Sequence, residues 1–124
     1  MQIEKENLIV ILGVSDNTDK YGYKIFKDLL EAGYKIKGIN PKGGQALSHT
    51  IYKNLEELDE KPDLVITVVK PEITLETVKK CSGMDIKKIW MQPGSESDQA
   101  IAEAKKLGME VVSNACFMII KKVW

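Results

Sequence analysis

The sequence Leu8-Ile-Val-Ile-Leu-Gly13-Val-Ser15-Asp-Asn-Thr-Asp-Lys20-Tyr21-Gly22-Tyr-Lys-Ile-Phe26 decides the fold. The apolar run predicts a buried strand, the small and polar residues a turn, and the apolar spacing after the turn a helix. This order is that of a nucleotide-phosphate site. However, Ser15 and Thr18 stand where a G-x-G-x-x-G fingerprint needs glycine, and Thr18 also excludes a phosphate loop of the G-x-x-x-x-G-K-[ST] kind. The turn therefore favours a phosphorylated ligand, but not a dinucleotide bound by the standard glycine fingerprint.

Strand and helix patterns alternate along the whole chain. The expected strands are Leu8–Leu12, Lys35–Ile39, Leu64–Val69, Ile86–Met91 and Glu110–Val112. The expected helices are Tyr21–Ala32 with Gly33 as its stop, Leu55–Leu58 capped by Asn54 and Glu57, Pro71–Lys80, and one from a capping box of Ser95 and Asp98 to Leu107. The pattern predicts an α/β protein: a single Rossmann-like doubly wound domain over residues 1–124, with about five parallel strands, right-handed crossovers and helices on both faces.

Composition excludes several classes of protein. The 124 residues fit one domain, and the 18 basic residues, all lysine, balance 18 acidic ones. A net charge of zero gives no reason to expect a nucleic-acid partner. We expect neither a signal peptide nor a membrane span, and the distant Cys81 and Cys116 indicate no disulfide. The best fit is a cytoplasmic, reduced protein. Without arginine, a phosphate must be held by backbone N–H groups and lysine.

The unusual residues gather where the expected strands end. In an open parallel sheet, ligands bind outside the carboxyl ends of the strands. The five exits are Gly13-Val14-Ser15, Asn40-Pro41-Lys42, Val69-Lys70-Pro71, Gln92-Pro93-Gly94 and Ser113-Asn114. Proline and glycine are common in turns, but their convergence on one edge predicts a binding crevice there.

The exit of the second strand discriminates between ligands. An NAD site places Asp or Glu there to hold the ribose hydroxyls, whereas this chain has Asn40-Pro41-Lys42. Lys42 followed by two glycines can meet an extra phosphate. This favours a phosphorylated ribose, as in NADP or the 3′-phospho-ADP end of coenzyme A. A surface turn with a solvated lysine is the alternative.

Candidate catalytic and metal-binding residues are few. His49 is the single histidine and has no carboxylate at a spacing that suggests a triad, so no catalytic residue and no metal ligand is assigned. Cys116 follows the fifth strand, near the expected crevice. It is either a small buried apolar residue or a thiol that could exchange with a thiol-bearing ligand.

An ordered set of motifs closely resembles the small stand-alone CoA-binding protein family, which is similar to the N-terminal CoA-binding domain of the succinyl-CoA ligase alpha subunit. The resemblance covers about Leu8 to Cys116. It is carried by Gly13-Val-Ser15, Lys20-Tyr21-Gly22-Tyr23, Leu30-Glu-Ala-Gly-Tyr34, Asn40-Pro41, Asp63-Leu-Val65, Lys70-Pro71-Glu72 and Trp90-Met91-Gln92-Pro93-Gly94.

The resemblance implies coenzyme A bound across the strand ends. It places the diphosphate at the Gly13–Ser15 turn and the helix start at Lys20 and Tyr21. It places a phosphate of the 3′-phospho-ADP at Lys42, after Asn40 and Pro41. Residues Val69-Lys70-Pro71 would line the adenine side of the site. Residues Met91-Gln92-Pro93-Gly94 would line the path of the pantetheine arm. The family often carries arginine at the third exit, where this chain has Val69-Lys70.

The sequence thus favours a coenzyme A or acyl-CoA binding protein without catalysis of its own. Ligase activity is not expected, because the ligase's phosphorylated histidine lies in a second domain and this chain has no histidine after His49. The alternatives are an NADP-type dinucleotide-binding or redox-sensing domain, and a covalent CoA carrier that uses Cys116. The apolar segment Phe117–Trp124 would pack as a strand or helix, or form a homodimer or protein-partner contact.

Overall fold

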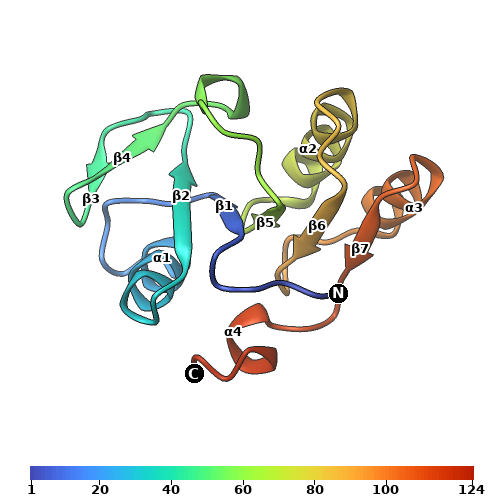
Figure 1. Cartoon of the computed structure of the whole chain (residues 1–124). Coiled ribbons are helices and arrows are strands. Elements are labelled where there is room, and N and C mark those ends of the chain that lie inside the picture. Colours follow the sequence, from blue (N-terminus) through green and yellow to red (C-terminus); the bar gives the residue numbers. More distant parts are fainter.

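A sheet with the strand order β3-β4-β2-β1-β5-β6-β7 runs through the molecule, in a computed structural model that describes residues 1–124 (Figure 1). Its strands are β1 (Leu8–Leu12), β2 (Lys35–Ile39), β3 (Gln45–Ala46), β4 (His49–Tyr52), β5 (Leu64–Thr67), β6 (Lys88–Met91) and β7 (Glu110–Val112). The helices are α1 (Tyr21–Glu31), the 3-10 turn η1 (Leu55–Glu57), α2 (Pro71–Gly83), α3 (Asp98–Lys106) and α4 (Phe117–Ile120).

The sheet has seven strands, which corrects the expectation of five. β4, β2, β1, β5, β6 and β7 run parallel, and β3 joins β4 as an antiparallel hairpin. The hairpin escaped the sequence analysis because its turn residues, Leu47 and Ser48, adopt positive φ angles of 52° and 65° without being glycine or asparagine. The parallel strands follow the order of doubly wound α/β sheets: strands are added on one side of β1 up to β4 and on its other side from β5 onward, so the strand order reverses between β1 and β5.

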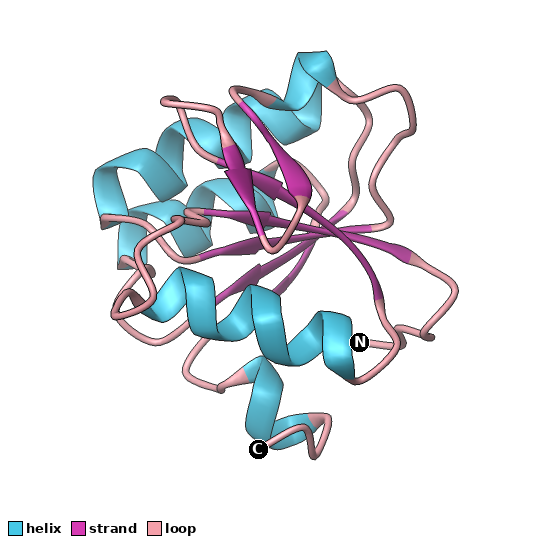
Figure 2. Ribbon diagram, turned by 90° about the vertical axis from the view of Figure 1, so that its left-hand side faces the viewer, coloured by secondary structure: helices cyan, strands magenta, loops and turns pink.

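Helices cover both faces of the sheet, as the sequence predicted (Figure 2). The alternation of side chains along β1 explains this, because successive residues point to opposite faces. Ile9 and Ile11 pack in the core beneath α1 and α4, whereas Leu8 and Val10 pack in the core beneath α2 and α3. A strand buried on both faces is apolar at every position, as β1 is.

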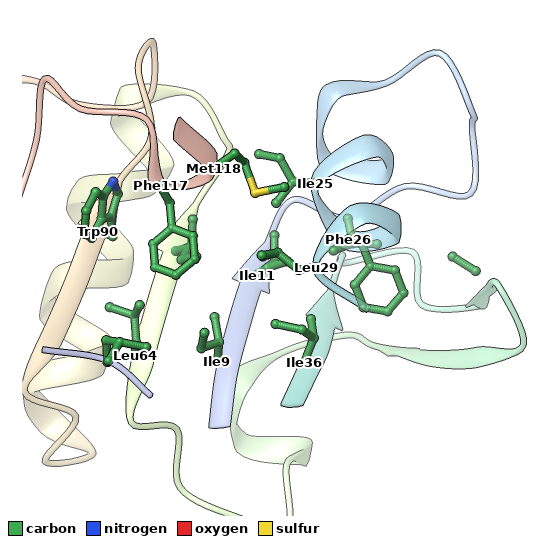
Figure 3. Packing of buried hydrophobic residues seen from close by; sticks show 14 of the residues in the cluster. Ile9, Ile11, Ile25, Phe26, Leu29, Ile36, Leu64, Trp90, Phe117 and Met118 are labelled. Atoms are coloured by element: carbon green, nitrogen blue, oxygen red, sulfur yellow. The ribbon is translucent and has the colours of Figure 1, made fainter. Parts of the chain in front are cut away.

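The C-terminal segment adds a short helix to the first of these cores. Phe117 and Met118 are fully buried, and the Phe117 ring packs edge-on against Trp90 at 5.1 Å between centroids (Figure 3). The Trp90 Nε1–H donates to the Ala115 carbonyl at 2.9 Å. These contacts hold residues 115–118 close to the carboxyl end of β6. The same helix leaves Ile119 and Ile120 exposed.

Several element ends differ from the expected ones. The cap of α3 is Ser97, whose Oγ accepts from the Ala100 N–H, while Ser95 is buried and bonded to Thr67. Strand β5 ends at Thr67, β6 begins at Lys88, and α2 continues to Gly83. No helix combines the length and the apolar character that crossing a bilayer requires.

Candidate functional site

The exit of β1 is a tight junction between backbone segments. Gly13 has a φ of +111°, and a Cβ there would lie 2.4 Å from the Val68 carbonyl oxygen. A Cβ on Gly22 would lie 2.0 Å from the Gly13 carbonyl oxygen. Gly13 therefore lets the exit of β1 approach the chain that follows β5, and Gly22 lets the start of α1 pack directly on the exit of β1. Gly22 permits the close helix–strand packing that the last glycine of a dinucleotide-binding fingerprint provides. Its spacing from Gly13 matches no standard fingerprint.

The donors of this turn are only partly free. The N–H groups of Gly13 and Val14 both donate to the Ile39 carbonyl, at 2.9 and 3.1 Å, and Ser15 Oγ accepts from Asn17 N–H. The N–H groups of Tyr21, Gly22 and Tyr23 have no protein acceptor, since the first bond of the helix runs from Lys24 N–H to the Lys20 carbonyl. The first turn of α1 thus offers free donors to an anion, and the N–H groups of Ser15, Asp16 and Thr18 in the preceding loop have no protein acceptor either.

Asn40 organises the exit of β2. Its Nδ2 donates to the Val14 carbonyl at 2.9 Å, and its Oδ1 accepts from the Lys42 N–H at 2.9 Å. One amide thus joins the exits of β1 and β2 and closes the turn that carries Pro41 and Lys42. The Lys42 side chain is exposed.

A cavity of about 240 Å³ opens between the exits of β1, β2 and β5 on one side and η1 and α2 on the other. Of the residues expected from the sequence, it brings together Gly13, Asn40, Pro41 and Val69. Its remaining lining residues are Leu12, Ile39, Lys53, Asn54, Leu55, Ile73, Glu76, Thr77 and Lys80. The volume lies below the ~300–1,000 Å³ of sites for whole drug-sized ligands, so this cavity suits one part of a larger molecule.

A second hollow of about 200 Å³ lies across the exit of β5 from the first. It is lined by Val68, Val69, Pro93, Gly94 and Ser95. Val69 lines both hollows, so they adjoin at the point where the strand order reverses. Lys20, Lys70 and Pro71 line neither hollow. The Met91 side chain is fully buried in the core beneath α2 and α3.

Gln92 is fully buried and joins three elements. Its Nε2 donates to the Tyr21 hydroxyl at 3.0 Å and to Cys116 Sγ at 3.4 Å, while its Oε1 accepts from Phe117 N–H at 2.7 Å. Tyr21 Oη lies 3.6 Å from the same sulfur. Side chains from the start of α1 and the exit of β6 therefore converge on the thiol of the residue before α4.

The two ionisable groups of this cluster have shifted pKa values. Burial, followed by the hydrogen bond with Cys116, raises the pKa of Tyr21 to about 12. Burial alone would raise the pKa of Cys116, but hydrogen bonds from Gln92 and Tyr21 and from the backbone N–H groups of Ile119 and Met118 outweigh it and lower the pKa. The cluster therefore stabilises the thiolate of Cys116.

The outer wall of the first cavity was not among the residues expected from the sequence. Ile73, Glu76, Thr77 and Lys80 are spaced i, i+3, i+4 and i+7, which places them on one face of α2. That spacing is visible once a helix is assigned from Pro71. Nothing in the sequence showed that this face, with η1, turns toward the strand exits.

Comparisons with known proteins identify relatives of this chain. Residues 7–122 match the sequence profile of a family described as "CoA binding domain". The chain is 25% identical to the uncharacterized protein YneT of Bacillus subtilis over 98% of this chain and 90% of that protein. It is 26% identical to the alpha subunit of acetate–CoA ligase (ADP-forming) I of Pyrococcus furiosus, over 90% of this chain and only 28% of the subunit.

A solved structure supports the same relationship. The chain superimposes on a conserved hypothetical protein from Pyrococcus furiosus with a TM-score of 0.87 and 32% sequence identity. The alignment covers 92% of this chain and 98% of that protein. The resemblance inferred from the sequence motifs is therefore confirmed.

Proposed function

This chain belongs to the CoA-binding domain family, and on that premise we propose that it binds coenzyme A or an acyl-CoA across the carboxyl ends of its parallel strands without catalysing a reaction. The observation that carries the proposal is the pair of adjoining hollows at the exits of β1, β2, β5 and β6. A Rossmann-like sheet binds its ligands at this edge, where the strand order reverses.

The first cavity suits the adenine end of the ligand. Leu12, Ile39 and Leu55 offer apolar surface to a flat heterocycle, and Ile73 is 43% exposed at its mouth. Burying such a side chain against a ligand favours binding. The Glu76 carboxylate supplies an acceptor for an exocyclic amine.

The remaining parts of coenzyme A would follow the edge of the sheet. The free N–H groups at the start of α1 suit the diphosphate, because they combine hydrogen bonding with the positive end of the helix dipole. The hollow beside Pro93 and Gly94 would take the pantetheine arm. Lys42 would stand at the ribose phosphate, and Lys20 and Lys70 would add positive charge nearby.

The absence of a catalytic role is also part of the proposal. The only histidine, His49, lies in strand β4 with its ring against Phe26, 5.9 Å between centroids. The ligase relative is more than three times as long as the stretch it shares with this chain, so most of that subunit lies outside the match. Both cysteines are free, which suits the reduced cytoplasm that we propose as its location.

Calorimetric titration tests this function. The purified protein is titrated with coenzyme A, dephospho-coenzyme A, NAD and NADP. We expect binding of coenzyme A and little heat from NAD. Tighter binding of NADP would instead support a dinucleotide-binding or redox-sensing domain.

A blocking variant locates the site. Val69→Phe fills the boundary of the two hollows and should weaken coenzyme A binding at least about tenfold, the effect of a steric block worth ~1.4 kcal/mol. Leu107→Phe, at the exposed end of α3, is the matched control and should leave the affinity unchanged. Equal affinities for both variants would place the ligand elsewhere.

A second candidate function is covalent capture of coenzyme A by Cys116, which the Tyr21–Gln92–Cys116 cluster favours. The Cys116 thiolate would attack coenzyme A disulfide, form a protein–CoA mixed disulfide and release one coenzyme A thiolate, so that no further oxidant is needed. Intact-mass analysis after incubation with coenzyme A disulfide tests it. A single CoA adduct that is lost in Cys116→Ser supports capture, and an unchanged mass excludes it.

A further inference from the structure

The first cavity contains two lysines in different electrostatic states. Lys80, on α2, pairs with Glu56 at 3.2 Å. Lys53 directly follows β4 and has no carboxylate within 4 Å of its Nζ. Lys53 is therefore the one lysine of the cavity whose ammonium group forms no ion pair.

Backbone contacts fix the position of Lys53. Its N–H donates to Glu57 Oε1 at 2.8 Å, which ties it to η1. Its side chain runs over Gly43, since a Cβ built there would lie 3.2 Å from both Cγ and Cε of Lys53. The aliphatic part of the Lys53 side chain thus lies against Gly43, the residue that directly follows Lys42. Two lysines from separate strand exits border the same turn.

The charges of the cavity are distributed over different walls. Lys53 comes from the β4–η1 side, and the unpaired Glu76 comes from α2. An anionic group of the ligand is therefore favoured near Lys53 and disfavoured near Glu76. A phosphomonoester carries a charge of about −1.5 to −2 at pH 7 and three acceptor oxygens, so it can engage more than one ammonium group.

We propose that Lys53, together with Lys42, recognises the phosphomonoester on the ribose of the nucleotide, and so makes the protein select coenzyme A over its dephospho form. The inference rests on the proposed coenzyme A function and adds a residue that determines specificity. Because the chain has no arginine, the phosphate is held by lysine point charges on either side of Gly43.

The test compares affinities for coenzyme A and dephospho-coenzyme A in Lys53→Met. Methionine keeps the unbranched stem that packs on Gly43 and removes the charge. We expect the affinity for coenzyme A to fall about fivefold, the size of a charge-assisted hydrogen bond at an exposed position, with no change for dephospho-coenzyme A. Lys53→Arg should retain the preference. Lys79→Met, on α2 outside the cavity, is the matched control and should behave as wild type.

The outcomes distinguish a failure of the Lys53 role from a failure of the proposed coenzyme A binding. If wild-type protein binds neither nucleotide, the proposed function fails and the inference fails with it. If wild type binds both equally, or if Lys53→Met weakens both alike or neither, coenzyme A binding stands and the role of Lys53 is wrong. An equal loss in Lys79→Met would reduce the effect to general surface charge.

Discussion

The two ends of the sheet contain the same kinds of residues and use them differently. At the amino end, Lys35 pairs with Glu60 at 2.7 Å, and Lys61 pairs with Asp85 at 3.4 Å. At the carboxyl end, Lys42 and Lys70 have no carboxylate within 4 Å. The charges of Lys35 and Lys61 are thus balanced within the protein, whereas those of Lys42 and Lys70 are left available.

Glycines differ between the two ends in the same way. Gly33, Gly83 and Gly108 lie at the amino end, where helices finish, and a Cβ on any of them would meet nothing within 4 Å. Gly13 and Gly22 lie at the carboxyl end, where a Cβ would collide with backbone. The difference teaches that these glycines end helices at one edge, whereas Gly13 and Gly22 permit close backbone packing at the other. Close packing is specific to those two positions, since Gly94 beside the second hollow also has nothing within 4 Å of a built Cβ.

The largest effect is expected from Gly22→Ala. The new methyl group would stand 2.0 Å from the Gly13 carbonyl oxygen and would push α1 away from β1. We expect a loss of about 3 kcal/mol in the free energy of unfolding, measured by urea denaturation.

Gly83→Ala is the matched control. Its site is open and helical, so stability should stay unchanged or rise by up to about 1 kcal/mol. Similar losses in both variants would contradict the contrast between the two ends.

The fold was largely predictable because its strongest patterns are local. The continuous apolar run of β1 and the stop at Gly33 placed β1, α1 and β2 within a residue of their observed ends. The β3–β4 hairpin was not predictable, since β3 has two residues and the turn uses Leu47 and Ser48 in left-handed conformations. In this hairpin, the pairing of β3 with β4 and of β4 with β2 accompanies a turn that local sequence preference does not favour.

The site was predictable as an edge but not as a set of contacts. The strand-end rule placed Gly13, Asn40 and Val69 together, and the first cavity contains all three. The rule could not show that the Ile39 carbonyl occupies the N–H groups of Gly13 and Val14. Nor could it show that Gln92 points inward to a thiol, because such orientations depend on tertiary packing.

The two cysteines provide the second prediction. Cys81 lies on α2 in the buried core, and burial raises its pKa to about 12, whereas the pKa of Cys116 lies below its ordinary value. Near pH 7 their ionised fractions should differ at least about a thousandfold. The more acidic thiolate, that of Cys116, is intrinsically less nucleophilic, which reduces the expected ratio of reaction rates about twentyfold. The burial of Cys81 restricts access of the reagent and increases that ratio again.

Alkylation with iodoacetamide, followed by peptide mass spectrometry, measures that difference. Cys116 should react at least about a hundredfold faster than Cys81 in the folded protein. Its rate should rise with pH and level off above its lowered pKa, where the thiolate is fully formed, while the rate of Cys81 should still be rising. Gln92→Leu removes a donor to the sulfur and should move the plateau of Cys116 to higher pH. Equal rates in folded protein, or no shift in Gln92→Leu, would contradict the electrostatic role of the cluster.

The smallest effect is expected from single lysines at the two ends. Lys42→Met removes an unpaired charge beside the first cavity. It should weaken coenzyme A binding about fivefold and make binding less sensitive to salt, because one fewer screened attraction remains. Lys35→Met breaks an exposed ion pair at the amino end. It should leave coenzyme A affinity unchanged and cost at most about 1 kcal/mol of stability, since such pairs contribute little. Titrations at two salt concentrations and urea denaturation measure both quantities. If Lys35→Met weakened binding as much as Lys42→Met, the ligand would respond to the overall charge of the protein, and the free lysines of the carboxyl end would have no special part in holding it.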